Sequence, residues 1–435
     1  MKSTRRTYTS RLTTILTLVG VAVGLGNVWR FPYMMGKYGG SAFLAVYLVF
    51  TFLFAIPALM AEIAIGRESG GGTLKAFKNA FGIRWGNTIG FLLLATVLIA
   101  GSYYAVVVGN VFFTTAFSIF HGFRAENIAQ YKSQLGNGWL QYGVTLAVVS
   151  AALIVVYLGL KKGIERISKV VVPFFLISLL YLIYHSLSLP GAISHLNDFL
   201  KPDISVLTAE HIFAALGQSF FSVGLGGTFM LVYGSYLREE EDIPNIAIST
   251  CLGNASASLL ASLFLVPAIL VYGLDIASGP GLIFATLPKL FSEMAFGRVL
   301  GSLFLLALSS VAFLSLVAAF EVFVSSVDKE VFSNVKRRNI IFSVGALMIA
   351  FTLPSSLYPS LIGTLDMVFG SGMQIFGSIL AVLGITWGLG RRTLVAQIFD
   401  VNSSGVVVEF TFIWLKWVVP TVLLSVLAGY IYSVV

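Results

Sequence analysis

The feature that most constrains this chain is a series of apolar stretches, each long enough to cross a bilayer. A hydrocarbon core about 30 Å thick requires about 20 helical residues. Hydrophobic residues make up 57% of the 435 residues and charged residues only 11%, whereas soluble domains carry about a quarter charged residues. The sequence therefore predicts an all-α integral membrane protein. We expect about eleven spans, near residues 12–34, 41–65, 88–120, 138–159, 166–187, 211–236, 244–272, 295–326, 339–353, 362–389 and 407–433.

Basic residues are distributed unevenly between the two sides of these spans. Nineteen Lys and Arg lie on the side of the N-terminus and six on the opposite side. Because cytoplasmic loops carry the excess of Lys and Arg, this predicts a cytoplasmic N-terminus and a multi-pass protein of the cell (inner) membrane. No signal-peptide cleavage site follows the basic N-terminal residues. The formal charge of +8 therefore indicates topology, and we expect no nucleic-acid partner.

The residues that usually carry catalysis or bind transition metals are scarce. Cys251 is the only cysteine, and the four histidines lie at or beyond the ends of the predicted spans. A single cysteine cannot form a disulfide within one chain, and the histidines lack the spacing of a metal site. No acid pair or Ser–His–Asp set is placed for catalysis. We therefore expect neither an enzyme nor a metal site beyond any for sodium.

Two nearly identical glycine stretches interrupt the first and sixth predicted spans. They are Val23-Gly24-Leu25-Gly26-Asn27 and Val223-Gly224-Leu225-Gly226-Gly227. Either one alone favours close helix packing, but interrupted helices at matching positions of inverted repeats indicate the binding site of a transporter. The pair predicts a single transporter domain, 1–435. It contains five-helix repeats at 11–187 and 210–390 and an additional helix at 407–433.

Polar side chains within the apolar spans support the same location. They are Arg30, Tyr47, Glu62, Tyr104, Gln218, Ser222, Asn254, Ser315, Glu321 and Asp366. Ionisable residues inside a membrane are functional candidates by default, because burying them is costly unless they are paired or solvated. At the breaks, free amides can hold a carboxylate and free carbonyls a small cation. Arg30 and Asp366 could pair, either as a gate or as a structural ion pair.

These segments resemble the neurotransmitter:sodium symporters, which have the LeuT-type fold with a 5+5 inverted repeat and unwound helices 1 and 6. The resemblance extends from Arg5 to about Tyr432, and its most specific segments run from Gly20 to Pro32 and from Gln218 to Ser222. It implies a secondary symporter that couples a small amino acid to sodium by alternating access.

The resemblance implies two sodium sites. The first would use oxygen atoms of residues around the two breaks, Ala22, Asn27, Ser222 and Asn254, completed by the substrate carboxylate. The second would use the carbonyls of Gly20, Val23 and Val311 together with Ser315. Leu314 stands where the family usually offers a hydroxyl or carboxylate. The sequence therefore leaves open whether one or two sodium ions bind.

The resemblance also implies a chloride ion. Chloride-dependent members bind it with residues that match Tyr47, Gln218, Ser222, Asn254 and Ser258, and chloride-independent bacterial members carry an acid at the position of Ser258. Without that fixed carboxylate, a bound anion can balance the local charge. We therefore expect chloride dependence. The alternative is that these groups only form hydrogen bonds between packed helices.

The substrate pocket implied by the resemblance has mostly small or apolar walls. Its expected lining is Val21, Ala22, Gly24, Leu25, Gly26, Ala100, Tyr104, Phe221, Ser222, Gly224, Gly227, Ser315, Ala318 and Ala319. Gly24 lies where monoamine carriers place an aspartate, which favours an amino acid over an amine. Small walls leave volume for a bulky hydrophobic side chain, aromatic or large aliphatic.

The resemblance further implies that Tyr104 bonds the substrate carboxylate and that Phe221 closes over the substrate. Arg30 with Asp366 would form the outer gate, and Arg5 with Asp328 and Tyr8 the inner gate.

Three alternatives remain open. A channel could also use polar residues between helices, but it would not concentrate its solute. A sensor would bind without transport. A carrier of the same fold could move another small organic solute or use another coupling ion. The sequence does not predict which amino acid is carried or the oligomeric state.

Overall fold

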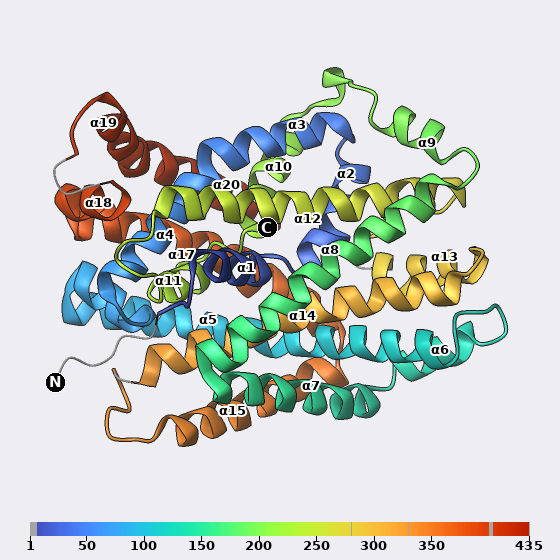
Figure 1. Ribbon diagram of the computed structural model, residues 1–435, viewed down its shortest axis with the longest axis horizontal. Helices are drawn as coiled ribbons and strands as arrows, with labels where there is room; N and C mark the ends of the chain where they lie inside the picture. The colour runs from blue at the N-terminus through green and yellow to red at the C-terminus, as the bar shows by residue number, and fades with distance from the viewer. Residues whose placement is uncertain (1–6, 280, 329, 400–402, 435) are drawn as a thin grey trace.

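The computed structural model describes residues 7–279, 281–328, 330–399 and 403–434. Every regular element in these ranges is a helix, and no strand occurs among them, which confirms the predicted all-α class. Most long helices run along the long axis of the molecule (Figure 1). The short helices α18 and α19 lie at one end of the bundle, and α6, α9 and α13 lie at the other (Figure 1).

The first half of the chain forms eight α-helices with three π-helical turns between them. In order they are α1 (Arg11–Ala22), η1 (Gly26–Arg30), α2 (Phe31–Lys37), α3 (Ser41–Phe50), η2 (Thr51–Ala55), α4 (Ile56–Ser69), α5 (Thr73–Phe120), α6 (Ile128–Leu135), α7 (Gly138–Gly159), η3 (Leu160–Ile164) and α8 (Glu165–Leu187).

The second half contains the sixth predicted span and those that follow it. Its elements are α9 (Ala192–Phe199), η4 (Ile204–Val206), α10 (Ala209–Ser222), α11 (Phe229–Gly234), α12 (Ile243–Val271), η5 (Leu282–Thr286), α13 (Leu287–Glu293), α14 (Gly297–Asp328), α15 (Arg337–Leu357), α16 (Ser360–Leu365), η6 (Asp366–Gly372), α17 (Met373–Leu383), η7 (Gly384–Gly388), α18 (Gly390–Ile398), α19 (Val406–Ile413), η8 (Trp414–Val418) and α20 (Val419–Val434).

The number of membrane spans depends on how broken helices are counted. In the described chain, eight helices are long and apolar enough to cross a membrane, and a ninth appears when α1 and the bent segment after it are joined. One of the eight, Gly138–Leu187, contains both α7 and α8, separated at Gly159, whose φ of 79° interrupts the helix. The protein is a multi-pass membrane protein, while the count of eleven spans and the orientation remain predictions.

The two predicted helix breaks are present, and glycines explain the second of them. The segments Arg11–Ala22 and Gly26–Lys37 meet at 64°. Between α10 and α11, Gly224 and Gly227 have φ of 72° and 70°, a left-handed conformation that glycine adopts without steric cost. Helices 1 and 6 are therefore unwound where the sequence predicts.

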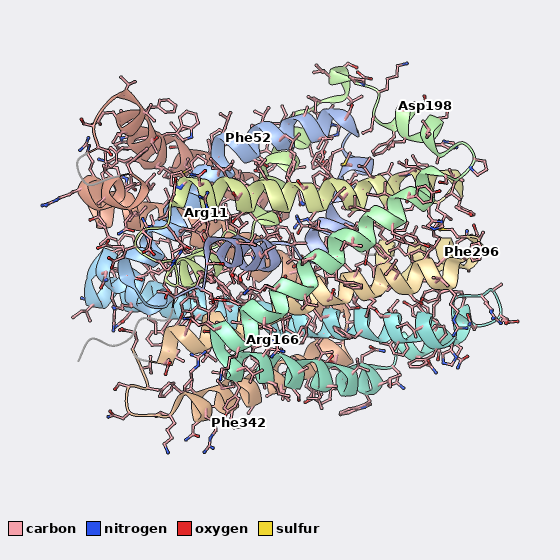
Figure 2. All side chains as sticks on the ribbon, viewed as in Figure 1. Arg11, Phe52, Arg166, Asp198, Phe296 and Phe342 are labelled. Carbon is pink, nitrogen blue, oxygen red and sulfur yellow. The ribbon has the colours of Figure 1, made fainter. Side chains whose placement is uncertain are left out.

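Burial separates central from peripheral helices. In α14, 72% of the most apolar window is buried inside the protein, compared with 28% for Val406–Tyr432. Phe52 and Phe342 are 51% and 66% exposed and lie on outward surfaces on opposite sides of the bundle (Figure 2). The central helix α14 can therefore line an internal site, whereas the last span presents most of its surface to lipid.

Candidate functional site

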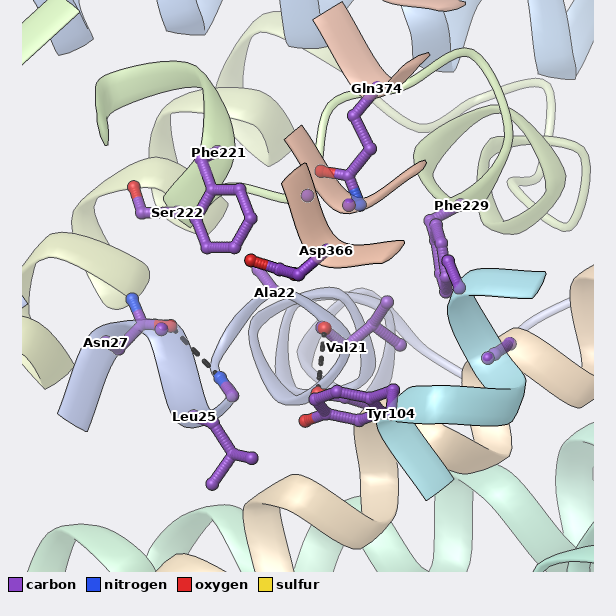
Figure 3. Close-up of a pocket in the computed structure, with 18 of the residues that line it drawn as sticks. Val21, Ala22, Leu25, Asn27, Tyr104, Phe221, Ser222, Phe229, Asp366 and Gln374 are labelled. Carbon is purple, nitrogen blue, oxygen red and sulfur yellow. Dashed lines mark hydrogen bonds between the residues drawn. The ribbon is translucent and has the colours of Figure 1, made fainter. Parts of the chain in front are cut away.

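The two helix breaks meet at an internal cavity of about 140 Å³ (Figure 3). This is close to the ~150 Å³ of an apolar cavity that binds benzene. Its walls come from both breaks, from α5 and α14, and from the η6–α17 segment. The lining residues are Val21, Ala22, Gly24, Leu25, Gly26, Asn27, Ala100, Gly101, Tyr103, Tyr104, Phe221, Ser222, Gly224, Phe229, Ser315, Ala319, Asp366, Gly370 and Gln374.

Twelve of the fourteen predicted substrate residues line this cavity, but Gly227 and Ala318 do not. Gly227 packs against α17 instead, because a Cβ added to it would lie 2.5 Å from the Gly377 carbonyl oxygen. Ala318 is fully buried and lies about 100° around the helix from Ala319, which does line the cavity. Neither residue lines the cavity in this structure, and their contact with a substrate stays a prediction.

Five lining residues were absent from the sequence-based site: Gly101, Tyr103, Phe229, Gly370 and Gln374. Gly101 and Tyr103 flank the predicted Ala100 and Tyr104, so only the orientation of α5 could add them. Gln374 is an amide within an apolar span, which is a signal that the sequence analysis did not use. Its side chain extends toward Asp366 and Phe229 (Figure 3), and its buried Oε1 has no hydrogen-bond partner among the described residues.

Three of the predicted ligands of the first sodium ion form one buried cluster. Asn27 Nδ2 donates to Asn254 Oδ1 at 2.7 Å, and Asn254 Nδ2 donates to Ser222 Oγ at 3.1 Å. The Gly24 amide donates to Asn27 Oδ1 at 3.0 Å (Figure 3). All the oxygen atoms offered here are neutral, and uncharged carbonyl oxygens at an unwound helix suit Na⁺. The negative charge that would balance the ion is missing from the cluster, so a substrate carboxylate can supply it.

Three residues of the predicted second sodium site lie close together, and one side-chain oxygen expected there is missing. Ser315 Oγ lies 3.2 Å from the Val23 carbonyl oxygen and 3.4 Å from that of Val311. Leu314 is buried, and its Cδ1 lies 3.1 Å from the position that a Cβ of Gly20 would occupy. A methyl group therefore packs beside Gly20, in the region where the resemblance would place a ligating side chain.

The residues predicted for chloride form a group rich in hydrogen-bond donors beside the sodium cluster. The hydroxyls of Tyr47 and Ser222 are 3.2 Å apart, and Asn27 Nδ2 donates to Ser258 Oγ at 2.9 Å. Gln218 lies one helical turn before Ser222 and is fully buried, and neither end of its amide has a partner in the described part of the chain. An unpaired buried donor costs about 1–3 kcal/mol. A bound anion could accept from it.

Phe221 separates the central cavity from a second one of about 690 Å³, since its ring lines both. The Arg30 guanidinium lies over this ring, 4.0 Å from its centroid. Asp366 instead accepts a hydrogen bond of 2.9 Å from the Tyr103 hydroxyl. The direct Arg30–Asp366 ion pair is thus not formed between these two described residues, and Arg30 stacks on the Phe221 ring instead.

The Glu62 carboxylate stabilises the second helix break. Its buried Oε1 accepts hydrogen bonds from the amides of Gly226 and Gly227, at 2.8 and 2.9 Å. These amides lie where the helix is unwound and cannot bond within it. An acid in the middle of an apolar span was the signal that marked Glu62 in the sequence.

At the other end of the bundle, α14 and α15 are joined by a charged cluster. Arg337 pairs with Glu321 at 2.7 Å and with Asp328 at 3.4 Å, and the Tyr236 hydroxyl donates to Glu321 at 2.5 Å. Arg337 is a partner that the sequence analysis missed. Arg5 lies outside the described residues, so its predicted pairing with Asp328 stays a prediction.

Tyr8 belongs to this same end of the molecule. Its hydroxyl donates to the Tyr233 carbonyl oxygen at 3.3 Å. Burial raises the pKa of Tyr8 well above its ordinary value, because a charged phenolate would be poorly solvated there. The hydroxyl therefore stays neutral and able to donate, which keeps the N-terminal segment in place before α1.

Known proteins match this chain over nearly its whole length. The sequence pattern of the Sodium:neurotransmitter symporter family matches residues 5–127 and 120–435. An uncharacterized sodium-dependent transporter of Methanocaldococcus jannaschii is 32% identical over 421 residues, covering 90% of this chain and 83% of the relative. The uncharacterized sodium-dependent transporter YhdH of Bacillus subtilis is 29% identical over 436 residues, 96% of each chain.

A solved structure matches as extensively. The crystal structure of MhsT in complex with L-phenylalanine superposes with a TM-score of 0.87 at 29% identity, covering 98% of this chain and 100% of that chain. The similarity therefore extends over the segments that contain both helix breaks. These relatives and the matching family are transporters.

Proposed function

Because this chain belongs to the Sodium:neurotransmitter symporter family, we propose that it carries a hydrophobic amino acid across the cell membrane together with sodium and chloride. The observation that carries this proposal is the meeting of two unwound helices at one cavity, with Asn27, Ser222 and Asn254 clustered at its edge. Such breaks supply amides for a carboxylate and carbonyls for a cation without any charged side chain.

Coupling between solute and ion follows from this neutral ligand set. An α-carboxylate bound near Gly24 and Gly26 would lie beside the sodium cluster and contribute the missing negative ligand. Each species then raises the affinity for the other by the same factor, because binding linkage is reciprocal. The Tyr104 hydroxyl lies 3.4 Å from the position of a Gly24 Cβ, which supports a hydrogen bond from it to the same carboxylate.

The size and chemistry of the cavity support a bulky apolar side chain. Its volume of about 140 Å³ compares with that of a benzene-binding cavity, and small residues such as Ala100 and Ala319 leave this space open. A Cβ at Gly24 would be 3.0 Å from Ser315 Oγ, so an aspartate that meets an amine has no room without rearrangement. MhsT, which superposes on this chain, binds L-phenylalanine in its crystal structure, and we propose an aromatic or large aliphatic amino acid here.

Alternating access would use the contacts at the two ends of the cavity. The Phe221 ring and the Arg30 guanidinium separate the substrate from the larger outer cavity, and their displacement would open that side. On the opposite side, Tyr236, Glu321 and Arg337 join helices that must separate for inward release. Each set of contacts can stay intact while the other is broken, so the two sides need never be open together. This is the requirement for a carrier rather than a channel.

Chloride would occupy the donor group formed by Tyr47, Gln218, Ser222, Asn254 and Ser258. The support is the unpaired amide of Gln218 and the absence of an acid at Ser258. An anion here would balance the sodium ion a few ångströms away, because both sites share Ser222 and Asn254.

Uptake into proteoliposomes tests the proposal. Purified protein would be supplied with a mixed pool of labelled amino acids under an inward sodium gradient, and a potassium gradient of the same size would be the control. We expect sodium-dependent, concentrative uptake of a hydrophobic amino acid that saturates and supports counterflow. Flux that never exceeds equilibrium would indicate a channel. Saturable binding without uptake would indicate a sensor, and uptake that ignores sodium would indicate another coupling ion.

A further inference from the structure

Lys416 lies within the last span, the one that presents the most surface to lipid. Its ammonium is surrounded by aromatic rings, 4.3 Å from the centroid of Trp387, 5.4 Å from Phe412 and 5.8 Å from Trp417. The Trp387 indole N–H donates to the Lys416 carbonyl oxygen at 3.3 Å, which ties η7 to η8. We call these four residues the Lys416 cage.

The Lys416 cage faces outward rather than into the protein. Trp387 and Trp417 are 50% and 55% exposed, and Phe410 and Ile413 on the same span are 60% and 53% exposed. No carboxylate of the described residues lies within 4.0 Å of the Lys416 ammonium. Cation–π contacts stabilise the charge only in part, and a lysine on a lipid-facing helix is costly unless it reaches a polar partner.

The position of the cage along the membrane normal indicates which polar partner Lys416 can reach. Trp387 precedes α18 by one turn, and α18 begins with the exposed basic residues Arg391 and Arg392. Gln397 of α18 accepts a hydrogen bond from Arg67, so α18 lies at the end of the bundle that the charge bias predicts to be cytoplasmic. Tryptophans concentrate at the headgroup level, and long lysine side chains extend toward it.

We propose that the Lys416 cage binds the phosphate of an anionic phospholipid in the leaflet at this end of the molecule. The Lys416 ammonium contacts the phosphate, Trp387 and Trp417 flank the glycerol region, and Arg392 adds positive charge from α18. Arg391 is already paired with Glu409, so it contributes less positive charge to the phosphate site. The exposed apolar side chains around the cage fit acyl chains and not a soluble anion. Basic sites between transmembrane helices on this face of a membrane are suited to anionic headgroups.

Native mass spectrometry of the intact protein in detergent tests this site. Phosphatidylglycerol and phosphatidylcholine with the same acyl chains would be titrated separately, and bound lipids counted. We expect phosphatidylglycerol to bind more tightly, with Lys416→Gln weakening the strongest bound lipid about five-fold, since one basic side chain near a charged lipid surface contributes about that factor. Lys416→Arg keeps the charge and should keep the binding.

Lys161→Gln is the matched control, because Lys161 is an exposed basic residue on η3, outside the cage, on the same predicted side of the membrane. It should bind phosphatidylglycerol as the unmodified protein does. Three results would each overturn the proposal. The two lipids could bind equally, or Lys161→Gln and Lys416→Gln could lose phosphatidylglycerol binding equally. The third is a dimer mass that depends on Lys416 and not on lipid. Because lipid binding is measured without transport, a negative result leaves the proposed symport untouched.

Discussion

The contact between Glu62 and the second helix break can be tested quantitatively. Glu62→Ala removes the shared acceptor of the Gly226 and Gly227 amides, which Glu62 Oε1 bonds at 2.8 and 2.9 Å. Glu62 is fully buried, so water does not readily replace it. Each buried N–H left without a partner costs about 1–3 kcal/mol. Two of them should lower the free energy of unfolding by about 2–6 kcal/mol, a change of about 30-fold to 10⁴-fold in the equilibrium constant.

The matched control is Glu62→Gln, which keeps a carbonyl oxygen near both amides. Thermal denaturation in detergent should place Glu62→Ala several degrees below Glu62→Gln. Because Gly224 and Phe229 on this break line the cavity, substrate binding should weaken at least about ten-fold in the alanine variant. If the two variants melt within about 1 °C of each other and bind substrate equally, the break does not depend on Glu62 and the reasoning is wrong.

Four further changes test the ion sites and the pocket. Ser258→Glu should relieve the chloride requirement of uptake, measured with gluconate in place of chloride; a requirement that persists would argue against the proposed anion site. Leu314→Thr should steepen the sodium activation curve, and an unchanged curve would count against a functional second sodium site. Ala319→Leu should fill part of the cavity and reduce tryptophan uptake more than alanine uptake. Equal losses would show that cavity volume does not select the substrate. If the buried Gln374 Oε1 accepts a donor from the substrate side chain, Gln374→Leu should lower tryptophan uptake relative to phenylalanine, and a constant ratio would exclude that contact.

Gly227 is unsuitable for the volume test, although the sequence places it in the pocket wall. Ala319 lines the cavity and is the better position. Gly227 has a left-handed backbone and lies against the Gly377 carbonyl, so any side chain there would disturb the packing of α17 before it changed the pocket. A substitution at Gly227 could not separate pocket volume from misfolding.

Local chemistry is enough to predict the helical class and the helix breaks. Apolar stretches in a bilayer must satisfy their backbone hydrogen bonds internally, so they form helices. The glycine stretches at Gly24 and Gly224 mark where two of these helices are interrupted, and at Gly224 glycine tolerates the left-handed backbone of the break. The polar residues Ser222 and Asn254 stand out because the surrounding membrane penalises them. Asn27 is indicated by the glycine stretch that it ends and by the family resemblance. The sequence therefore determines the class, the position of the breaks and most of the polar residues that cluster beside them.

Only the tertiary structure decides which way each side chain faces and which partner it takes. Gln374 reaches the cavity and Ala318 does not, because the rotation of a helix about its own axis depends on all the side chains packed around it. Arg30 stacks on Phe221 rather than pairing with Asp366, and Arg337 joins Glu321. These contacts connect residues that are distant in sequence. Their choice depends on distances of a few ångströms between packed helices, which periodicity and composition do not specify.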